Sequence, residues 1–210
     1  MKRRAALLVV DVQVDFCPGG ALAVPDGDQV LSPLNRYLGL FSETSTPIFA
    51  SRDWHPPTSK HFRENGGIWP PHCIQGTAGA AFHPHLRFPE GTIVVSKGMA
   101  DWDDGYSAMA GVTENGTPLT MLLRRMALDR LYIGGLATDY CVKETVLDAL
   151  REGFAVTLLT DAIRGVDVEP GDSHRAAKAM LEAGAEEASF DSVRGALTAD
   201  RNGADHARRG

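Results

Sequence analysis

Short apolar runs rich in β-branched residues alternate with segments of helical period along most of the 210-residue sequence. Residues 5–10 form the first of these runs, and residues 130–136 form a later one. A continuous apolar run is typical of a strand that is buried on both faces. Strands that alternate with helices are joined by right-handed crossovers, which build a parallel sheet covered by helices. The pattern therefore predicts an α/β fold around a doubly wound parallel sheet with helices on both faces.

The expected elements can be placed from these runs. Strands are expected at residues 5–10, 47–51, 92–96, 130–136, 155–160 and 185–190. Helices are expected at residues 28–41, 119–127, 139–152 and 171–182. Residues 56–89 have no regular period and are rich in proline, glycine and histidine. Loops of that length in a compact domain are usually functional, so we expect an ordered functional loop there.

Composition and charge narrow the class of protein. Hydrophobic residues make up 43% of the chain and charged residues 23%, values that are typical of a globular protein. We expect a single domain over residues 1–197 and a polar tail over residues 198–210, because one domain commonly reaches about 200 residues. The net charge of −6 gives no support for nucleic-acid binding, which needs a basic surface.

Cysteine usage and the amino terminus indicate the compartment. The three cysteines are widely separated and odd in number, which argues against a disulfide framework and favours a reducing compartment. Residues 1–4 before an apolar run resemble the start of a signal peptide, but Asp11 and Asp15 interrupt the run. No stretch approaches the roughly 18 apolar residues of a membrane span. We therefore expect a cytoplasmic protein without membrane or nucleic-acid partners, and a homo-oligomer is left open.

Four chemically capable residues follow the first four expected strands. They are Asp11, Asp53, Lys97 and Cys141. The carboxyl ends of parallel strands share one edge of the sheet, where open α/β folds bind ligands. Cys141 also opens an expected helix, whose dipole would lower the pKa of its thiol. We therefore predict a cysteine nucleophile with Asp11 as its base and Lys97 as a nearby cation, although a structural role for each residue is the alternative.

Carboxylate and imidazole side chains gather after the second expected strand. Asp53 and His55 are two residues apart, a spacing that lets both side chains turn toward one ion, and His72 follows in the long loop. Such ligands suit zinc, iron or manganese. The sequence therefore predicts one divalent metal ion bound by Asp53, His55 and His72, with either His61 or Glu64 as a fourth ligand.

Four aromatic residues stand near these positions in the sequence, namely Phe16, Trp69, Tyr106 and Tyr140. Aromatic rings can sandwich a flat ligand ring. Packing in the core or in a lid is an equally good interpretation of each one. The pattern therefore makes them candidates for substrate binding without deciding between the two roles.

Five motifs carry a family resemblance that covers residues 5–184. They read VVDVQVDF at 9–16, DWH at 53–55, WPPHCIQGT at 69–77, KG at 97–98 and GLATDYCV at 135–142. Together they resemble the nicotinamidase/pyrazinamidase branch of the isochorismatase-like cysteine hydrolases. The resemblance implies a six-stranded parallel sheet and the hydrolysis of nicotinamide to nicotinate and ammonia, with pyrazinamide-like analogues as further substrates.

The resemblance also implies roles for residues around the cysteine. Asp11, Lys97 and Cys141 match the catalytic triad of the family. The peptide between Leu136 and Ala137 is expected to be cis, and the backbone N–H groups of Ala137 and Cys141 are expected to form an oxyanion hole.

The remaining implied roles concern the metal and the substrate. Asp53, His55 and His72 match the metal ligands, and His61 and Glu64 match positions that bind the metal in different members. Phe16, Trp69 and Tyr106 resemble the residues that flank the pyridine ring, and Tyr140 is a further candidate for that contact.

Two departures from the family pattern bear on the substrate. Tyr140 stands where many members have histidine, and residues 99–105 differ from the usual wording. Three alternatives to a nicotinamidase stay open at this point. One is a related hydrolase that acts on a carbamoyl or ureido compound or on isochorismate; another is a non-catalytic module that binds a metal or a ring. The third is a metal-dependent hydrolase in which Cys141 is structural.

Overall fold

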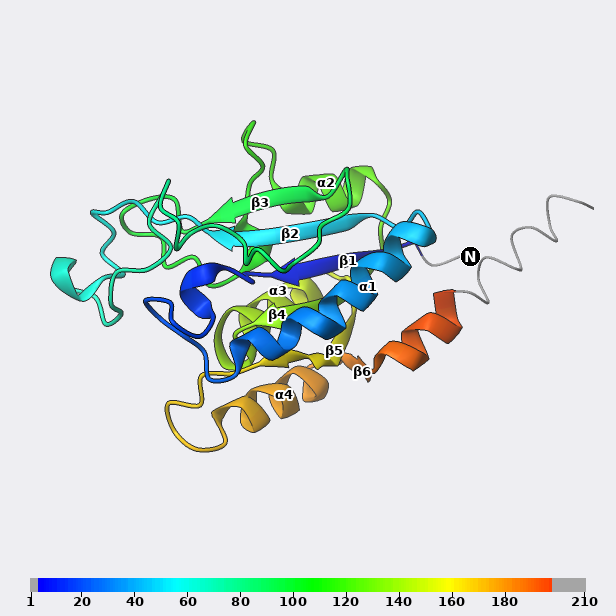
Figure 1. Ribbon diagram of the computed structural model, residues 1–210. Coiled ribbons are helices and arrows are strands. Elements are labelled where there is room, and N and C mark those ends of the chain that lie inside the picture. The colour runs from blue at the N-terminus through cyan, green and yellow to red at the C-terminus, as the bar shows by residue number, and fades with distance from the viewer. Residues whose placement is uncertain (1–3, 198–210) are drawn as a thin grey trace, which may run out of the picture.

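Six parallel strands form one sheet in the computed structural model, which describes residues 4–197 (Figure 1). The strands are β1 (Ala5–Val10), β2 (Ile48–Asp53), β3 (Ile93–Lys97), β4 (Arg130–Leu136), β5 (Ala155–Arg164) and β6 (Glu186–Ala188). Their order across the sheet is β3-β2-β1-β4-β5-β6, and each neighbouring pair is parallel. The predicted six-stranded, doubly wound α/β fold is confirmed.

Helices cover both faces of this sheet. They are α1 (Leu31–Glu43), α2 (Leu119–Arg125), α3 (Lys143–Arg151) and α4 (Asp172–Glu182), and residues 190–197 are also helical. Leu7 and Val9 of β1 pack in a core cluster with residues of α1. Leu8 and Val10 point to the opposite face and pack in a second cluster with residues of α2 and α3. The first strand is apolar at every position because a helical layer lies on each side of it.

The bounds of some elements differ from those expected. β5 extends to Arg164 instead of ending at Thr160, because it pairs again with the end of β4 after a register shift. A 3₁₀ turn, Gly27–Val30, precedes α1, so the α-helix begins at Leu31. The polar tail expected at residues 198–210 lies outside the described residues. Within the part of the chain that is described, no helix has the length and apolar character needed to cross a bilayer.

The long segment between β2 and β3 is irregular, as predicted, apart from the 3₁₀ turn Arg63–Asn65 and isolated bridges. One of these bridges joins His55 to Ile74, and another joins Gln13 to Phe82. Figure 1 shows the segment, in cyan to green, at the end of the sheet toward which the strand arrows point. This long loop therefore lies over the carboxyl edge of the sheet.

Candidate active site

The carboxyl ends of four adjacent strands bring the four predicted residues together. Lys97 ends β3, Asp53 ends β2, Asp11 follows β1, and Cys141 follows β4 after a short turn. All four side chains are buried. Asp11 has a left-handed backbone with φ of 49°, a conformation that aspartate tolerates better than most residues. We refer to Asp11, Asp53, Lys97 and Cys141 as the lysine cluster.

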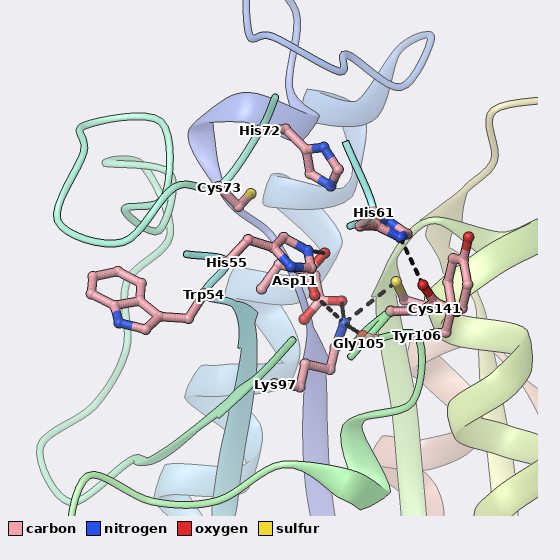
Figure 2. Close-up of polar contacts among 12 residues, drawn as sticks. Asp11, Trp54, His55, His61, His72, Cys73, Lys97, Gly105, Tyr106 and Cys141 are labelled. Atoms are coloured by element: carbon pink, nitrogen blue, oxygen red, sulfur yellow. Dashed lines mark hydrogen bonds and ion pairs between the residues drawn. The ribbon is translucent and has the colours of Figure 1, made fainter. Parts of the chain in front are cut away.

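The ammonium group of Lys97 lies at the centre of this cluster (Figure 2). Its Nζ is 2.7 Å from Oδ2 of Asp11, 2.5 Å from Oδ1 of Asp53 and 3.5 Å from Sγ of Cys141. It also donates to the carbonyl oxygen of Gly105. Burial lowers the pKa of a lysine, but the two carboxylates outweigh this effect and raise the pKa of Lys97 well above its usual value. The side chain therefore stays protonated between them.

The two carboxylates of the cluster differ although both contact Lys97. Burial raises the pKa of Asp11 to about 6, against the opposing effects of Lys97 and of a 2.7 Å hydrogen bond donated by Ser51 Oγ. Burial also acts to raise the pKa of Asp53, but Lys97 and His55 outweigh it and hold that pKa well below its usual range. Asp11 can therefore exchange a proton near neutral pH, whereas Asp53 stays ionised.

Cys141 lies in a π-helical turn and not in the first turn of an α-helix. The turn is Thr138–Val142, closed by a 3.1 Å bond from Val142 N–H to the carbonyl of Ala137, and α3 begins at Lys143. The expected lowering of the thiol pKa is wrong. Burial raises the pKa of Cys141 well above its usual value, and the opposing effect of Lys97 does not offset it. The resting group is a thiol, which needs a base to become a nucleophile.

A carboxylate that can act as this base lies close to Cys141. One carboxylate oxygen each from Asp11 and Asp53 and the Sγ of Cys141 lie within 4.8 Å of one another. The peptide between Leu136 and Ala137 is cis, which confirms that part of the prediction. Gly135 has φ of 129°, and a Cβ there would lie 2.0 Å from the carbonyl oxygen of Val10. Only glycine therefore fits at this next-to-last residue of β4.

Three histidines gather beside the lysine cluster, and we call His55, His61 and His72 the histidine cluster. Ligand-capable nitrogens of the three buried rings lie within 4.8 Å of one another (Figure 2). Oδ2 of Asp53 is 3.6 Å from Nε2 of His55, so Asp53 borders both clusters. Glu64 is exposed and, among the described residues, is not part of any such group. The structure thus brings together Asp53 and the three histidines and leaves Glu64 apart.

The nitrogens of the histidine cluster suit a divalent cation. Within residues 4–197, neither ring nitrogen of the fully buried His55 has a hydrogen-bond partner, a state that costs about 1–3 kcal/mol per group. Nδ1 of His72 donates to the Pro70 carbonyl at 2.8 Å, which leaves its Nε2 lone pair free. Burial lowers the pKa of His72 to about 4 and also lowers the pKa of His61, so both rings are neutral and able to coordinate.

An open pocket of about 420 Å³, counted with its mouth, leads to Cys141. Phe16, Trp69, Tyr106 and Tyr140, the four predicted aromatics, all line it. Trp69 Nε1 donates a 3.0 Å hydrogen bond to the hydroxyl of Tyr106, and the ring of Tyr140 lies 5.1 Å from that of Trp69. Ala137 and Asp53 line the same pocket. Its size and its aromatic walls suit one small ring compound.

Several residues that shape the site were not found from the sequence. The side-chain amide of Gln13 donates to the carbonyl of Asp53 and accepts from its N–H, at 2.9 and 2.8 Å. Ser51 fixes Asp11, and its only sequence signal is a hydroxyl inside an apolar strand. Other pocket-lining residues carry no local signal because they lie in turns and loops, namely Leu22, Val24, Asp104 and Val166.

The sequence matches the isochorismatase domain over residues 5–191. The chain belongs to the isochorismatase family. Within that family it is 42% identical over 199 residues to the nicotinamidase of Escherichia coli K12, which covers 86% of this chain and 92% of that protein. It is 40% identical over 167 residues to the nicotinamidase/pyrazinamidase of Mycobacterium tuberculosis H37Rv, covering 78% and 88%.

A solved structure of a similar protein agrees with the fold. The pyrazinamidase of Pyrococcus horikoshii in complex with zinc superposes with a TM-score of 0.81 at 44% identity, covering 89% of this chain and 99% of that one. The family predicted from the five motifs is therefore confirmed. The isochorismatase-family site combines a thiol, a proton acceptor and a buried cation beside an aromatic pocket, an arrangement suited to covalent acyl transfer.

Proposed function

We propose that this protein hydrolyses nicotinamide to nicotinate and ammonia, and pyrazinamide-like analogues in the same way, through a thioester on Cys141. The observation that carries the proposal is the position of Sγ of Cys141. It faces an aromatic pocket, lies 3.5 Å from Nζ of Lys97 and is within 4.8 Å of a carboxylate oxygen of Asp11. The relatives at 40% and 42% identity, both named nicotinamidases, support the same substrate.

The first half of the reaction forms the thioester. Asp11 takes the proton of the Cys141 thiol as Sγ attacks the carbon of the carboxamide. The N–H groups of Ala137 and Cys141 stabilise the negative charge on the carbonyl oxygen, and one such donor contributes about 3 kcal/mol to lowering the barrier. The C–N bond then breaks, Asp11 returns its proton to the leaving nitrogen, and ammonia departs.

The second half regenerates the thiol. A water molecule gives a proton to Asp11 and attacks the thioester carbon, the C–S bond breaks, and Sγ takes the proton back from Asp11. Lys97 stays protonated throughout, since its positive charge offsets Asp11 and Asp53. The raised pKa of Asp11, about 6, suits a group that must both accept and return a proton near neutral pH.

The pocket walls hold the substrate ring. Phe16, Trp69, Tyr106 and Tyr140 pack around the pyridine ring. Asp53, His55, His61 and His72 would hold one divalent cation, for which zinc, iron and manganese are all suited to the ligand set. When bound, the cation supplies a Lewis acid for the ring nitrogen. Zinc is the cation in the Pyrococcus horikoshii structure, which makes it our first choice here.

The test is ammonia release from nicotinamide by the purified protein supplied with zinc, iron or manganese. We expect turnover by the wild type and background release by Cys141→Ala, with thermal unfolding showing that both are folded. If the wild type releases no more ammonia than the variant, the proposal is wrong. A ureido compound assayed in parallel tests the related-hydrolase alternative, and turnover of that compound alone would replace our substrate assignment.

A further inference from the structure

We propose that Asp139 is a positioning residue for substrate binding. Its carboxylate fastens the Val166 wall of the pocket to the turn that carries Cys141. The inference rests on the proposed function, because it concerns how the same pocket holds its substrate. Asp139 lies two residues before Cys141 in the π-helical turn, and only 7% of it is exposed.

Both oxygens of this carboxylate are engaged by one segment of the chain, the loop between β5 and α4. Oδ1 accepts from the backbone N–H of Val166 at 2.9 Å, and Oδ2 accepts from the N–H of Asp167 at 2.8 Å. Hydrogen bonds to an ionised acceptor are shorter and stronger than neutral ones. The nearly buried carboxylate therefore acts as a two-point clamp on a loop distant in sequence.

The opposite side of the loop is held by α4. Asp167 has a left-handed backbone with φ of 50°, and its carboxylate accepts from the N–H and the hydroxyl of Ser173, both at 2.8 Å. Gly165 leaves no space for a side chain. A Cβ there would lie 1.8 Å from Oγ of Ser173 and 3.0 Å from Oδ1 of Asp139. Residues 165–167 are thus held between the π-helical turn that carries Cys141 and α4.

Within the described chain, this loop meets the pocket at one residue. Val166 lines the pocket together with Tyr140 and Cys141, whereas Asp139 is not among the lining residues in the described chain. The contacts among Asp11, Lys97 and Cys141 do not involve Asp139. A change at Asp139 should therefore move the wall that touches the ring and leave the proton-transfer groups in place.

The expected signature is a split between the two kinetic constants. In Asp139→Asn, the amide keeps one oxygen acceptor and turns an NH₂ group toward the other backbone N–H. Loss of one hydrogen bond to a charged acceptor shifts the equilibrium between the held and the released wall by about tenfold or more. We expect KM for nicotinamide to rise about tenfold, with kcat within about threefold of the wild type.

The experiment uses Asp139→Asn, Val166→Ala and the double variant, assayed with the zinc-supplied protein. If Asp139 acts through Val166, the double variant raises KM no further than the larger single effect, because effects within one pathway do not add. Amide hydrogen exchange at residues 166 and 167 should be faster in Asp139→Asn than in the wild type. A fall in kcat with unchanged KM, or effects that multiply in the double variant, would overturn the proposal.

A matched control separates positioning from general stability. Asp161 on β5 also accepts a backbone N–H, from Phe190 at 3.0 Å, and the hydroxyl of Tyr37 at 2.8 Å, and it does not line the pocket in the described chain. Asp161→Asn should lower the unfolding temperature and leave KM unchanged. An equal rise of KM in both Asn variants would mean that lost stability explains the result.

One further variant tests the α4 side of the loop. Ser173→Ala loosens the α4 side of the loop and should raise KM by about twofold to threefold even if Asp139→Asn does not fold; an unchanged KM would contradict the clamp. Hydrogen exchange at residues 166 and 167 needs no substrate. Unchanged exchange in a folded Asp139→Asn protein would refute the clamp, whereas a wild type without nicotinamide turnover would refute only the proposed function.

Discussion

The lysine cluster and the histidine cluster are buried side by side at one edge of the sheet, yet the chain pairs the charges of the first and leaves ring nitrogens of the second unpaired. Lys97 contacts two carboxylates, a carbonyl and a thiol. His55, in contrast, has no hydrogen-bond partner at either ring nitrogen within residues 4–197. A buried polar network is stable when every member is paired. The charges of the lysine cluster are therefore paired within the chain, which makes it the complete cluster, although Oδ2 of Asp11 has only its ion pair with Lys97 and no hydrogen bond in the described residues. The histidine cluster is incomplete in this sense, since it offers unpaired nitrogens to the proposed cation.

The largest effect should come from breaking the complete cluster. Lys97→Met leaves Asp11 and Asp53 buried without a cation, and removal of one partner of a buried ion pair typically costs about 3–5 kcal/mol. We expect that loss in the free energy of unfolding, measured by urea denaturation without added metal, together with loss of ammonia release. Lys143→Met removes a partly exposed lysine 3.2 Å from Glu144 and should change stability by less than about 0.5 kcal/mol. Equal losses in both variants would contradict the comparison.

The next effect should appear at the incomplete cluster when a cation is added. At a free zinc concentration about 100 times Kd, binding should stabilise the folded protein by about 2.7 kcal/mol. His72→Gln should abolish most of this gain while changing the metal-free protein much less than Lys97→Met does. His85→Gln, at an exposed histidine outside the cluster, should keep the full gain. A zinc-dependent rise in unfolding temperature that survives His72→Gln would place the cation elsewhere.

A glycine beside the histidine cluster provides a test that changes no ligand. Gly98 has φ of 66°, and a Cβ there would lie 2.4 Å from Cε1 of His55. Gly98→Ala should weaken zinc binding about tenfold and destabilise the protein by about 1 kcal/mol or more, as alanine does at positive φ. Gly91 has φ of 82°, and its Cβ would meet nothing within 4 Å in the described structure. Gly91→Ala should lose stability through the same backbone strain but keep its affinity for zinc. Equal zinc affinities in the two variants, measured by chelator competition, would refute the steric argument.

The smallest effect should be a shift in pH dependence at the complete cluster. Asp11 must be ionised to accept the thiol proton, so kcat/KM should fall about tenfold per pH unit below about pH 6. The hydrogen bond from Ser51 stabilises the ionised form and lowers the pKa of Asp11. Ser51→Ala should therefore move the acid limb of the pH profile to higher pH. If the acid limb stays in place or moves to lower pH, its pKa does not belong to Asp11.

The local sequence pattern predicted most of the fold. It failed where the end of a strand is set by pairing with another strand that is distant in the sequence. A continuous apolar run such as β1 or β4 has few alternatives to a buried strand, so these strands were placed at their observed bounds. The extension of β5 to Arg164 depends on pairing with Leu136 after a register shift. The residue pattern of β5 alone cannot predict this pairing, because the pairing depends on both strands.

The candidate site also contains residues that the local pattern predicted and residues that only the folded structure identified. The ends of four strands predicted that Asp11, Asp53, Lys97 and Cys141 would meet, because parallel strands present their carboxyl ends on one edge. His61 and Glu64 lie in a segment without regular period, so the sequence could not choose between them, and only the folded loop buries one and exposes the other. The two hydrogen bonds of Asp139 to the loop at residues 166–167 had no sequence signal, because the partners are backbone N–H groups.

By itself the sequence determined the layered fold, the family and the chemical types of the groups at the site, because periodicity and residue identity are local properties of the chain. Only the tertiary structure decided the protonation states of those groups. Burial raises the pKa of the Cys141 thiol, where a helix start had predicted a thiolate, and it raises the pKa of Asp11 to about 6. The carboxylates of Asp11 and Asp53 keep Lys97 charged against the opposing effect of burial. These values depend on desolvation and on charges from four strands, which exist only once the sheet has formed.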